Sequence, residues 1–454
     1  FIPEEASKAR PAMKHHSLAA LALLTAAGTA SAQSSVTVFG IVDVGISRYT
    51  SKSTYHSPNP FALPPANPGG GSAKTSQTAL SNSGYAGSRI GFRGTEDLGG
   101  GLAASFWLES GITNDDGAKG ITNFNRRSTM SLSGPFGELR LGRDYAATFW
   151  NDTVFDPFGT NGVGTNLIAN INSRIAAIAG PGSVVAATDN YIRTGNSIGY
   201  FLPPNLGGFY GQLQYTLHEN TKRSDQPGTP SAKGRYVGGR LGYASGPLDM
   251  AIAYGQSTAA DSTTLNALGI ATATQERKIN ALNLGASYNF GPAKLFAEVS
   301  RVQDKNETGT LQNLPGLAVP FMNTTTRKDK YNGYMLGVTV PVGPGLIRAS
   351  YASVKYKNGA PAATDLNSLL WGLNGNRDTT ANQISLGYVH NLSKRTALYA
   401  SVSRIRIKDG WNNPGVMGAI TGGSAAYLTG GTAQAAGWAA RCSMGFDFRI
   451  RHAF

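Results

Sequence analysis

Residues 36–46 read Val-Thr-Val-Phe-Gly-Ile-Val-Asp-Val-Gly-Ile, and this stretch decides the fold. Its even positions are apolar or glycine, whereas the odd positions include Thr37 and Asp43. Alternation with a period of two is typical of a β-strand with one apolar face and one polar face. The stretch therefore predicts a strand that separates an apolar environment from a polar one.

The same alternation recurs along the whole chain. It is found again in residues 88–94, 102–108, 282–290, 334–340, 384–388 and 444–454. In the last of these segments, Phe446 and Phe448 share one face, and Asp447 and Arg449 share the other. A soluble β-sandwich can show this alternation too, so the connections between the strands have to distinguish the two folds.

The connections fall into two length classes. Seven short turns rich in glycine, proline or asparagine begin near residues 96, 134, 203, 245, 290, 341 and 391. Eight long polar connections span 50–83, 112–122, 148–190, 219–233, 257–277, 304–328, 358–378 and 408–437. Seven turns on one side and eight loops on the other join 16 strands, and an even number is the rule for bacterial outer-membrane barrels. We therefore predict an all-β fold, a 16-stranded antiparallel transmembrane β-barrel.

The composition agrees with a barrel and excludes several other classes of protein. Of the 454 residues, 58 are glycine and 15% are charged, whereas about 7% glycine and about 25% charge are usual. The one cysteine, Cys442, excludes a disulfide scaffold, and the histidines lack metal-ligand spacing, so we expect neither a metal nor a cofactor. No apolar run is long enough for a transmembrane helix. Two or three soluble domains remain the alternative for a chain of this length.

The charge pattern predicts a water-filled lumen. The net charge is +14, and the basic residues are dispersed along the chain, which argues against a nucleic-acid partner. Strand parity places inside the barrel the basic residues Arg89, Arg93, Arg127, Arg140, Arg193, Arg240, Lys294, Arg348, Arg441, Arg449 and Arg451, and the acids Asp43, Glu109, Glu138, Asp249, Glu298 and Asp447. A lipid-facing Arg or Lys costs about 2–4 kcal/mol at mid-bilayer, so these charges need water inside the barrel.

Residues 13–32 have the features of a secretory signal peptide. Met13 begins a short basic region, residues 18–27 are apolar, and Ala30-Ser31-Ala32 precede Gln33. A small-residue motif after an apolar core is typical of a cleavage site, which we expect between Ala32 and Gln33. Residues 1–12 are interpreted as a non-native upstream extension and residues 33–454 as the barrel.

Several motifs are specific in combination, although no single one is. They lie at residues 35–45, 87–102, 108–111, 139–145, 156–159, 196–200 and 451–454. On these motifs the chain from Ser34 to Phe454 resembles the trimeric general porins of Gram-negative outer membranes, in the version found in β-proteobacteria. The resemblance implies a homotrimer surrounded by outer-membrane lipid and lipopolysaccharide. It also implies that the barrel-assembly machinery reads Phe454 as its C-terminal signal.

The resemblance further implies that the third long connection, about Thr148 to Asn190, folds into the lumen and narrows it. In the family, acids on this loop face arginines on the opposite wall. The loop acids here are Asp152 and Asp156, the wall arginines are Arg89, Arg93, Arg127, Arg140 and Arg193, and further lumen acids are Glu109 and Asp43. The family usually has a neutral amide at the position of Arg127, so this pore should be more basic. The sequence leaves open whether residues 168–187 enter the lumen.

These observations predict a channel and not an enzyme. We expect passive diffusion of small hydrophilic solutes, neutral or anionic, with a preference for anions because Arg and Lys linings favour them. A channel specific for one solute is the nearest alternative. A barrel that acts as an adhesin or receptor and a barrel hydrolase are further alternatives, but a hydrolase needs converging His with Ser or Asp, and histidines are sparse.

Overall fold

The computed structural model describes residues 35–55, 71–175, 190–221, 232–266, 270–312, 321–359, 378–410, 415–428 and 438–454. The expected upstream extension, the signal peptide and the cleavage site between Ala32 and Gln33 lie outside these ranges, and so do residues 176–189 of the third long connection. In the described ranges, no helix has the length and apolar character needed to cross a membrane.

Antiparallel strands make up most of the described chain. They are β1 (Ser35–Tyr55), β2 (Ser72–Asn82), β3 (Arg89–Gly99), β4 (Leu102–Gly111), β5 (Arg127–Gly134), β6 (Gly137–Tyr145), β7 (Arg193–Phe201), β8 (Phe209–Thr216), β9 (Tyr236–Ser245), β10 (Leu248–Leu265), β11 (Ala271–Asn289), β12 (Lys294–Gln312), β13 (Phe321–Val342), β14 (Gly345–Lys357), β15 (Thr379–Asn391), β16 (Thr396–Lys408) and β17 (Trp438–Ala453).

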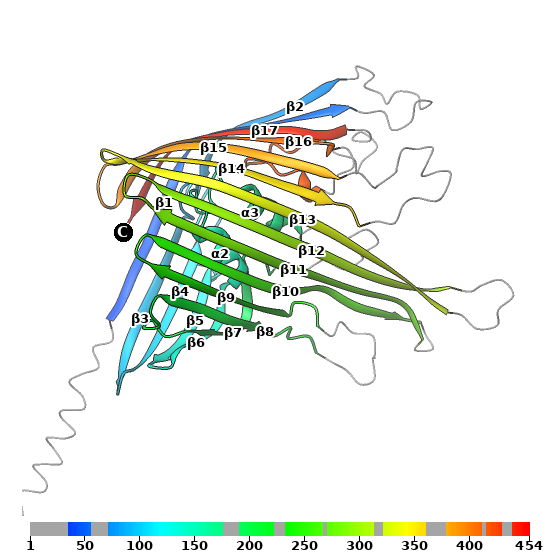
Figure 1. Cartoon of the computed structure of the whole chain (residues 1–454), viewed down its shortest axis with the longest axis horizontal. Coiled ribbons are helices and arrows are strands. Elements are labelled where there is room, and N and C mark those ends of the chain that lie inside the picture. Colours follow the sequence, from blue (N-terminus) through cyan, green and yellow to red (C-terminus); the bar gives the residue numbers. More distant parts are fainter. Residues whose placement is uncertain are drawn as a thin grey trace, which may run out of the picture.

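The sheet closes on itself into a barrel (Figure 1). β1 pairs with β17, so the first and last strands of the chain are neighbours. β1 also pairs with β2 along its second half and with β3 along its first residues. β2 and β3 therefore share one position in the wall, interrupted at residues 83–88, and the 17 strand segments occupy the predicted 16 positions. The predicted antiparallel barrel is confirmed.

The two faces of the wall follow the parity that the sequence predicts. On β1, Val38 is 53% exposed and Ile46 60%, whereas Asp43 and Ser47 are buried. On β17, Phe448 is 65% exposed and its neighbour Arg449 is buried. An apolar outer band with polar side chains inside is typical of a transmembrane barrel.

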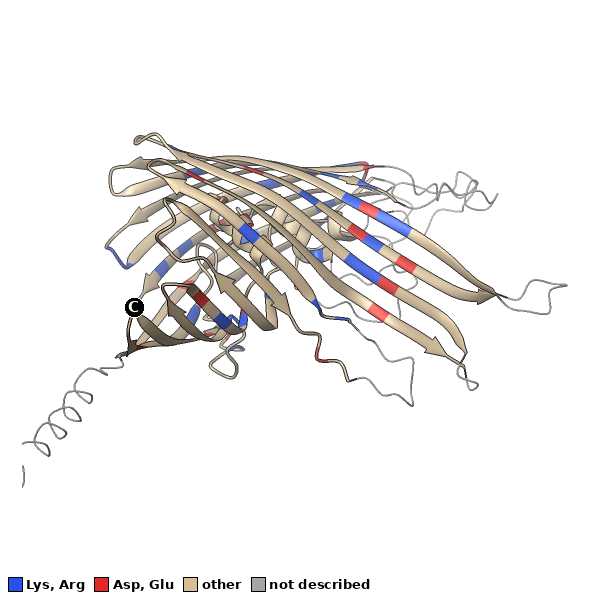
Figure 2. Ribbon diagram, turned by 60° about the horizontal axis from the view of Figure 1, so that its bottom comes forward, with Lys and Arg blue, Asp and Glu red and all other residues tan. Residues whose placement is uncertain are grey.

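Three of the expected loops contain long stretches of strand. Residues 50–83 contain the end of β1 and all of β2, residues 257–277 belong mostly to β10 and β11, and residues 304–328 to β12 and β13. Basic and acidic residues alternate along the outer ends of these strands, with Lys278 paired to Glu276 and Lys305 to Glu307 (Figure 2). Beyond the apolar band both faces of a strand meet water, so the side chains no longer alternate between apolar and polar. The hydrogen bonding between strands nevertheless continues there.

The third long connection packs against the inner face of the wall. It forms α2 (Ala147–Val154), which contacts β9, β10 and β11, and α3 (Leu167–Ile175), which contacts β12 to β15. Apolar residues of α3 are buried together with the inward side chains Tyr331 and Met335 and with the 3-10 turn η2 (Gly415–Met417). The described part of residues 168–187 therefore does enter the barrel, as an apolar cluster on one side.

Glycines on the inner wall allow the connection to approach closely. A Cβ on Gly285 of β11 would collide with the ring of Phe155, and a Cβ on Gly337 of β13 would collide with the ring of Pro157. At Gly445 of β17 a Cβ would meet Val163. The connection thus lies along the inner side of β9 to β17, and it leaves β3 to β7 to face the lumen.

Candidate functional site

Neighbouring strands β3 to β7 carry an arc of arginines, called the arginine wall below. It consists of Arg89 and Arg93 on β3, Arg126 just before β5, Arg127 on β5, Arg140 on β6 and Arg193 on β7. The strand register brings them together, because Arg127 lies opposite Glu109 and Arg193 lies opposite Tyr145. The five predicted arginines lie on one wall, and the structure adds Arg126.

Glu109 organises the first half of the arginine wall. Its Oε1 lies 2.5 Å from Nε of Arg126 and 3.7 Å from Nε of Arg89. Trp107 donates its indole N–H to the other oxygen at 3.1 Å. The predicted lumen acid Glu109 is therefore shared by two arginines, which hold it as a carboxylate.

Asp144 and Glu138 organise the second half. Nη1 of Arg140 lies 2.5 Å from Oδ2 of Asp144, and Nε of Arg140 lies 2.9 Å from Oε1 of Glu138. Arg127 lies 3.8 Å from the same carboxylate of Asp144. Arg140 is thus the most fully neutralised member of the wall.

Aromatic rings hold the guanidinium groups in place. Arg127 lies 4.6 Å from the ring centroid of Trp107, Arg140 3.9 Å from that of Phe201, and Arg193 4.4 Å from that of Tyr145. Stacking of this kind fixes a cation without neutralising its charge.

Arg93 is the exposed member of the arginine wall, whereas Arg193, which also lacks a carboxylate partner in the described ranges, donates to the hydroxyl of Tyr145 at 3.0 Å. Its guanidinium lies 5.5 Å from the ring centroid of Phe39 and 5.2 Å from that of Trp107, and within the described ranges no carboxylate lies within ion-pair distance of it. The side chain is exposed. Arg93 therefore presents an uncompensated charge to the lumen.

The arginine wall carries a net positive charge. Six guanidinium groups face three carboxylates, Glu109, Glu138 and Asp144, so the excess is three charges. Sequence reasoning missed Arg126 and Asp144. Arg126 precedes its strand, where parity does not apply, and Asp144 follows a register shift between Gly142 and Asp144.

The loop acid Asp152 lies against the wall and away from the open lumen. It is fully buried, accepts a hydrogen bond from the hydroxyl of Tyr191, and accepts another from Nδ2 of Asn283 at 2.5 Å. Burial raises the pKa of Asp152 above its ordinary value. The carboxyl group anchors α2 to β11.

The second loop acid, Asp156, shapes the loop itself. Its carboxylate accepts backbone N–H groups from Phe158 at 2.9 Å, Thr160 at 3.0 Å and Asn166 at 3.1 Å. Burial raises its pKa to about 6, against the lowering effect of these hydrogen bonds. The family resemblance implied that both loop acids face the arginine wall, but neither does. Both carboxyl groups are instead engaged in hydrogen bonds that hold the loop in place.

Other expected lumen groups also have structural contacts. Asp43 accepts backbone N–H groups of Tyr85 at 2.7 Å and Ala86 at 2.9 Å, and the hydroxyl of Tyr399 at 2.5 Å, so it fixes the break between β2 and β3. Asp447 pairs with Arg449 at 2.8 Å, and both are buried. These groups point inward as parity predicts, but they are enclosed by protein.

The chain offers no metal centre in the part that the structure describes, where three or more His, Cys, Asp or Glu side chains do not gather in a suitable group. The carboxylates of the arginine wall form ion pairs with arginines. The site as a whole is suited to attract anions from water.

Comparison with known proteins agrees with this geometry. A family model described as Gram-negative porin matches residues 17–410. Outer membrane porin protein 32 of Delftia acidovorans is 40% identical over 394 residues, which cover 87% of this chain and 90% of the relative. An outer membrane porin of Bordetella pertussis is 32% identical over 408 residues, which cover 86% of this chain and 93% of the relative.

Solved structures show the same fold. An anion-selective porin from Comamonas acidovorans superposes with a TM-score of 0.61 at 34% sequence identity, covering 93% of this chain and 100% of that one. An outer membrane protein of Vibrio cholerae reaches a TM-score of 0.51 at 12% identity. With a family match over most of its length and a closed 16-position barrel, the chain belongs to the Gram-negative porins and is an outer-membrane channel.

Proposed function

We propose that this porin lets small hydrophilic solutes diffuse passively across the outer membrane and that it prefers anions. The observation that carries the proposal is the arginine wall, which has three more positive than negative groups and is left uncovered by α2 and α3. Transport is uncoupled, and the chain supplies a lined passage without a catalytic role.

The preference arises from fixed charge beside a narrow column of water. Basic linings favour anions in pores, and low-dielectric walls focus the field and raise the local concentration of counterions. An anion that reaches Arg93 exchanges part of its hydration for charge-assisted hydrogen bonds, and the next guanidinium groups lie on the adjacent strands. Because aromatic rings hold the arginines, they stay in position while the solute passes.

The field in this pore comes mainly from one side. Asp152 and Asp156 are buried on the opposite side, and the apolar cluster around α3 adds bulk. The one charged side chain of α3, Arg174, is directed to the carbonyl of Gly418. The loop therefore narrows the opening and pushes solutes toward the arginines. The Comamonas porin that carries the description anion-selective supports this proposal, since it is 34% identical and the match covers 93% of this chain.

Two assays on the purified protein test the proposal. In planar bilayers it should form steady water-filled channels, and in liposome-swelling assays uptake rates should fall smoothly with solute size and be faster for organic anions than for sugars of equal size. Silent bilayers would overturn the channel. Rapid uptake of one solute together with exclusion of others of the same size and charge would favour the solute-specific alternative.

We further propose three features of maturation and assembly. N-terminal sequencing of the mature protein should begin at Gln33, after removal of residues 13–32 and of the non-native extension 1–12. The barrel-assembly machinery should read Phe454, whose backbone exchanges two hydrogen bonds with Gly40 at 3.1 Å in the closed barrel. The working form should be a homotrimer in contact with outer-membrane lipid and lipopolysaccharide, and gentle detergent extraction followed by light scattering would measure the subunit number.

A further inference from the structure

A pocket lies between α3 and residues 420–422, which follow η2. It has a volume of about 260 Å³, and its lining also includes Phe149 of α2 and Ile192, the residue before β7. The apolar face of α3 is packed against the wall with Tyr331 and Met335, so the opposite face of the helix is turned to the lumen. The pocket is therefore a recess beside the passage, and no member of the arginine wall lines it.

The lumen face of α3 is polar because polar residues recur there with a helical period. Asn170, Ser173 and Arg174 are three or four residues apart, a spacing that places side chains on one face of a helix. All three are half-buried and line the pocket. The residues that fill the other face are buried, and they are Leu167, Ile168, Ile171 and Ile175.

The hydroxyl and amide groups of the pocket already donate hydrogen bonds within the protein. The hydroxyls of Thr165 and Ser173 donate to the backbone carbonyls of Gly162 at 2.8 Å and Asn170 at 3.1 Å. Nδ2 of Asn170 donates to the carbonyl of Ile420 at 2.9 Å. The lone pairs of the two hydroxyls and the Oδ1 atom of Asn170 remain as acceptors, so the lining is suited to receive hydrogen bonds from the hydroxyl groups of a solute.

Arg174 adds one positive charge to the same pocket. Its Nη1 lies 3.4 Å from the carbonyl oxygen of Gly418, and in the described ranges no carboxylate lies within ion-pair distance of it. The lining of the pocket contains no acidic residue. Because a guanidinium carries five N–H donors, most of them remain for an anionic ligand.

We propose that this pocket binds polyhydroxylated monocarboxylates, the class of sugar acids, with the carboxylate on Arg174 and the hydroxyl groups on the acceptors of Thr165, Asn170 and Ser173. A carboxylate accepts charge-assisted hydrogen bonds from a guanidinium, and the neighbouring hydroxyls donate to the acceptors beside it. At about 30 Å³ for each water molecule, the pocket holds about eight of them, enough room for a six-carbon sugar acid. The proposal rests on the proposed passage of solutes through the lumen and adds a solute class to it.

Other solutes match only part of the pocket. A neutral sugar leaves Arg174 without a counter-charge, and an anion without hydroxyl groups leaves the acceptors without donors. A small inorganic anion is better matched to the arginine wall, where guanidinium groups lie on adjacent strands.

Block of the chloride current by added solutes, in single channels of the purified full-length porin, tests the proposal. The probes are gluconate, glucose, which has hydroxyls and no carboxylate, and at about pH 8 morpholinoethanesulfonate, an anion of similar size without hydroxyls. Gluconate should interrupt the current at the lowest concentration. Arg174→Gln should weaken this block about tenfold, and Thr165→Val and Ser173→Ala about threefold each, the factors expected for one charged and one neutral hydrogen bond.

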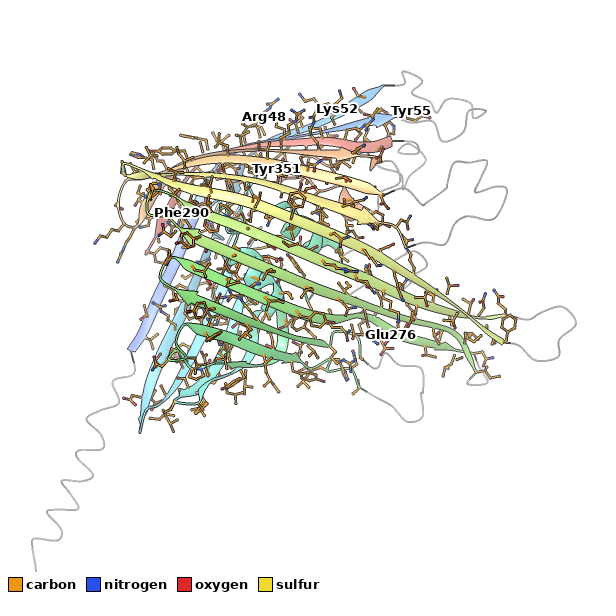
Figure 3. All side chains as sticks on the ribbon, in the orientation of Figure 1. Arg48, Lys52, Tyr55, Glu276, Phe290 and Tyr351 are labelled. Carbon is orange, nitrogen blue, oxygen red and sulfur yellow. The ribbon has the colours of Figure 1, made fainter. Side chains whose placement is uncertain are left out.

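Arg48→Gln is the matched control for the loss of a positive charge. Arg48 is exposed and projects from the outer side of the wall (Figure 3), so its loss should leave the block by gluconate unchanged. Open channels in potassium chloride show that each variant has folded and inserted.

Three outcomes would overturn the proposal. They are equal block by gluconate and morpholinoethanesulfonate, equal block by gluconate and glucose, and a gluconate block that Arg93→Gln weakens and Arg174→Gln does not, which would place the binding at the arginine wall. Silent bilayers or a cation preference of the wild type would refute the proposed function instead, so the two failures are distinguishable.

Discussion

Replacing Arg93 with glutamine removes an exposed charge of the arginine wall that no carboxylate in the described ranges offsets. Arg93 is held only by the rings of Phe39 and Trp107, at 5.5 and 5.2 Å from their centroids. No ion pair breaks in the variant, and the lost cation–π contacts amount to about 1 kcal/mol at an exposed site. We therefore expect Arg93→Gln to fold, to insert and to conduct.

The expected change in selectivity follows from Coulomb's law. A unit charge acts on a monovalent ion 4 Å away with about 1 kcal/mol in bulk water and about 4 kcal/mol at an effective dielectric constant of 20. A water-filled lumen lies near the lower value. An anion loses about 1 kcal/mol of attraction and a cation loses the same repulsion, so their free-energy difference changes by about 2 kcal/mol, which is about a 30-fold change in permeability ratio.

The assay is the anion-to-cation permeability ratio of single channels in 0.1 M salt, where the screening length is about 10 Å. Arg301→Gln is the matched control, because Arg301 is exposed on the outward side of β12 and its loss changes the net charge equally. An unchanged ratio in Arg93→Gln, or an equal change in Arg301→Gln, would refute the reasoning from the lumen charge.

Three further predictions follow from the loop and the wall. Gly285→Leu should displace Phe155 from the inner wall and change the conductance of single channels while the barrel stays folded; an unchanged conductance would mean that the loop does not limit the opening. The pKa of Asp156 rises from its ordinary 3.8 to about 6, so between these values the folded loop holds a proton that the unfolded loop releases. The folding stability of the loop should therefore fall by about 3 kcal/mol as pH rises from 4 to above 6. Hydrogen exchange of residues 147–175 measures this, and Asp156→Asn should reduce the dependence, leaving the part that comes from Asp152. Glu109→Gln should raise the anion preference by adding to the positive excess, and a fall in that preference would show that Arg126 moves out of the lumen when its partner is lost.

The barrel was readable from the sequence because the bilayer enforces a simple rule on each strand. Every outward position between the two interfaces must be apolar and every charge must point inward, so parity alone placed Arg89, Arg140 and Arg449 on the inner face. Outside the bilayer both faces of a strand can be polar, so the alternation is lost. For this reason the sequence of the long ends of β10 to β13 predicted loops. The interruption between β2 and β3 depends on Asp43 and the backbone of residues 85–86, a tertiary contact that carries no periodic signal.

The details of the site were less predictable for a related reason. The position of Asp152 is set by Asn283 and Tyr191, which lie far from it in the sequence, and spacing along the loop contains no information on that contact. Arg126 could have been suspected from the Arg-Arg pair at 126–127, because both residues next to a strand end can reach the lumen. Inward glycines on β11, β13, β15 and β17 were the available signal that the loop would lie on that side.

The zero-current potential of the wild-type channel across a tenfold potassium chloride gradient measures the central claim most directly. A water-filled lumen with three excess positive charges predicts a zero-current potential whose sign shows that chloride permeates more easily than potassium. The size of this potential should decrease when both solutions are raised toward 1 M salt. A potential of the opposite sign, or one near zero at low salt, would contradict the account.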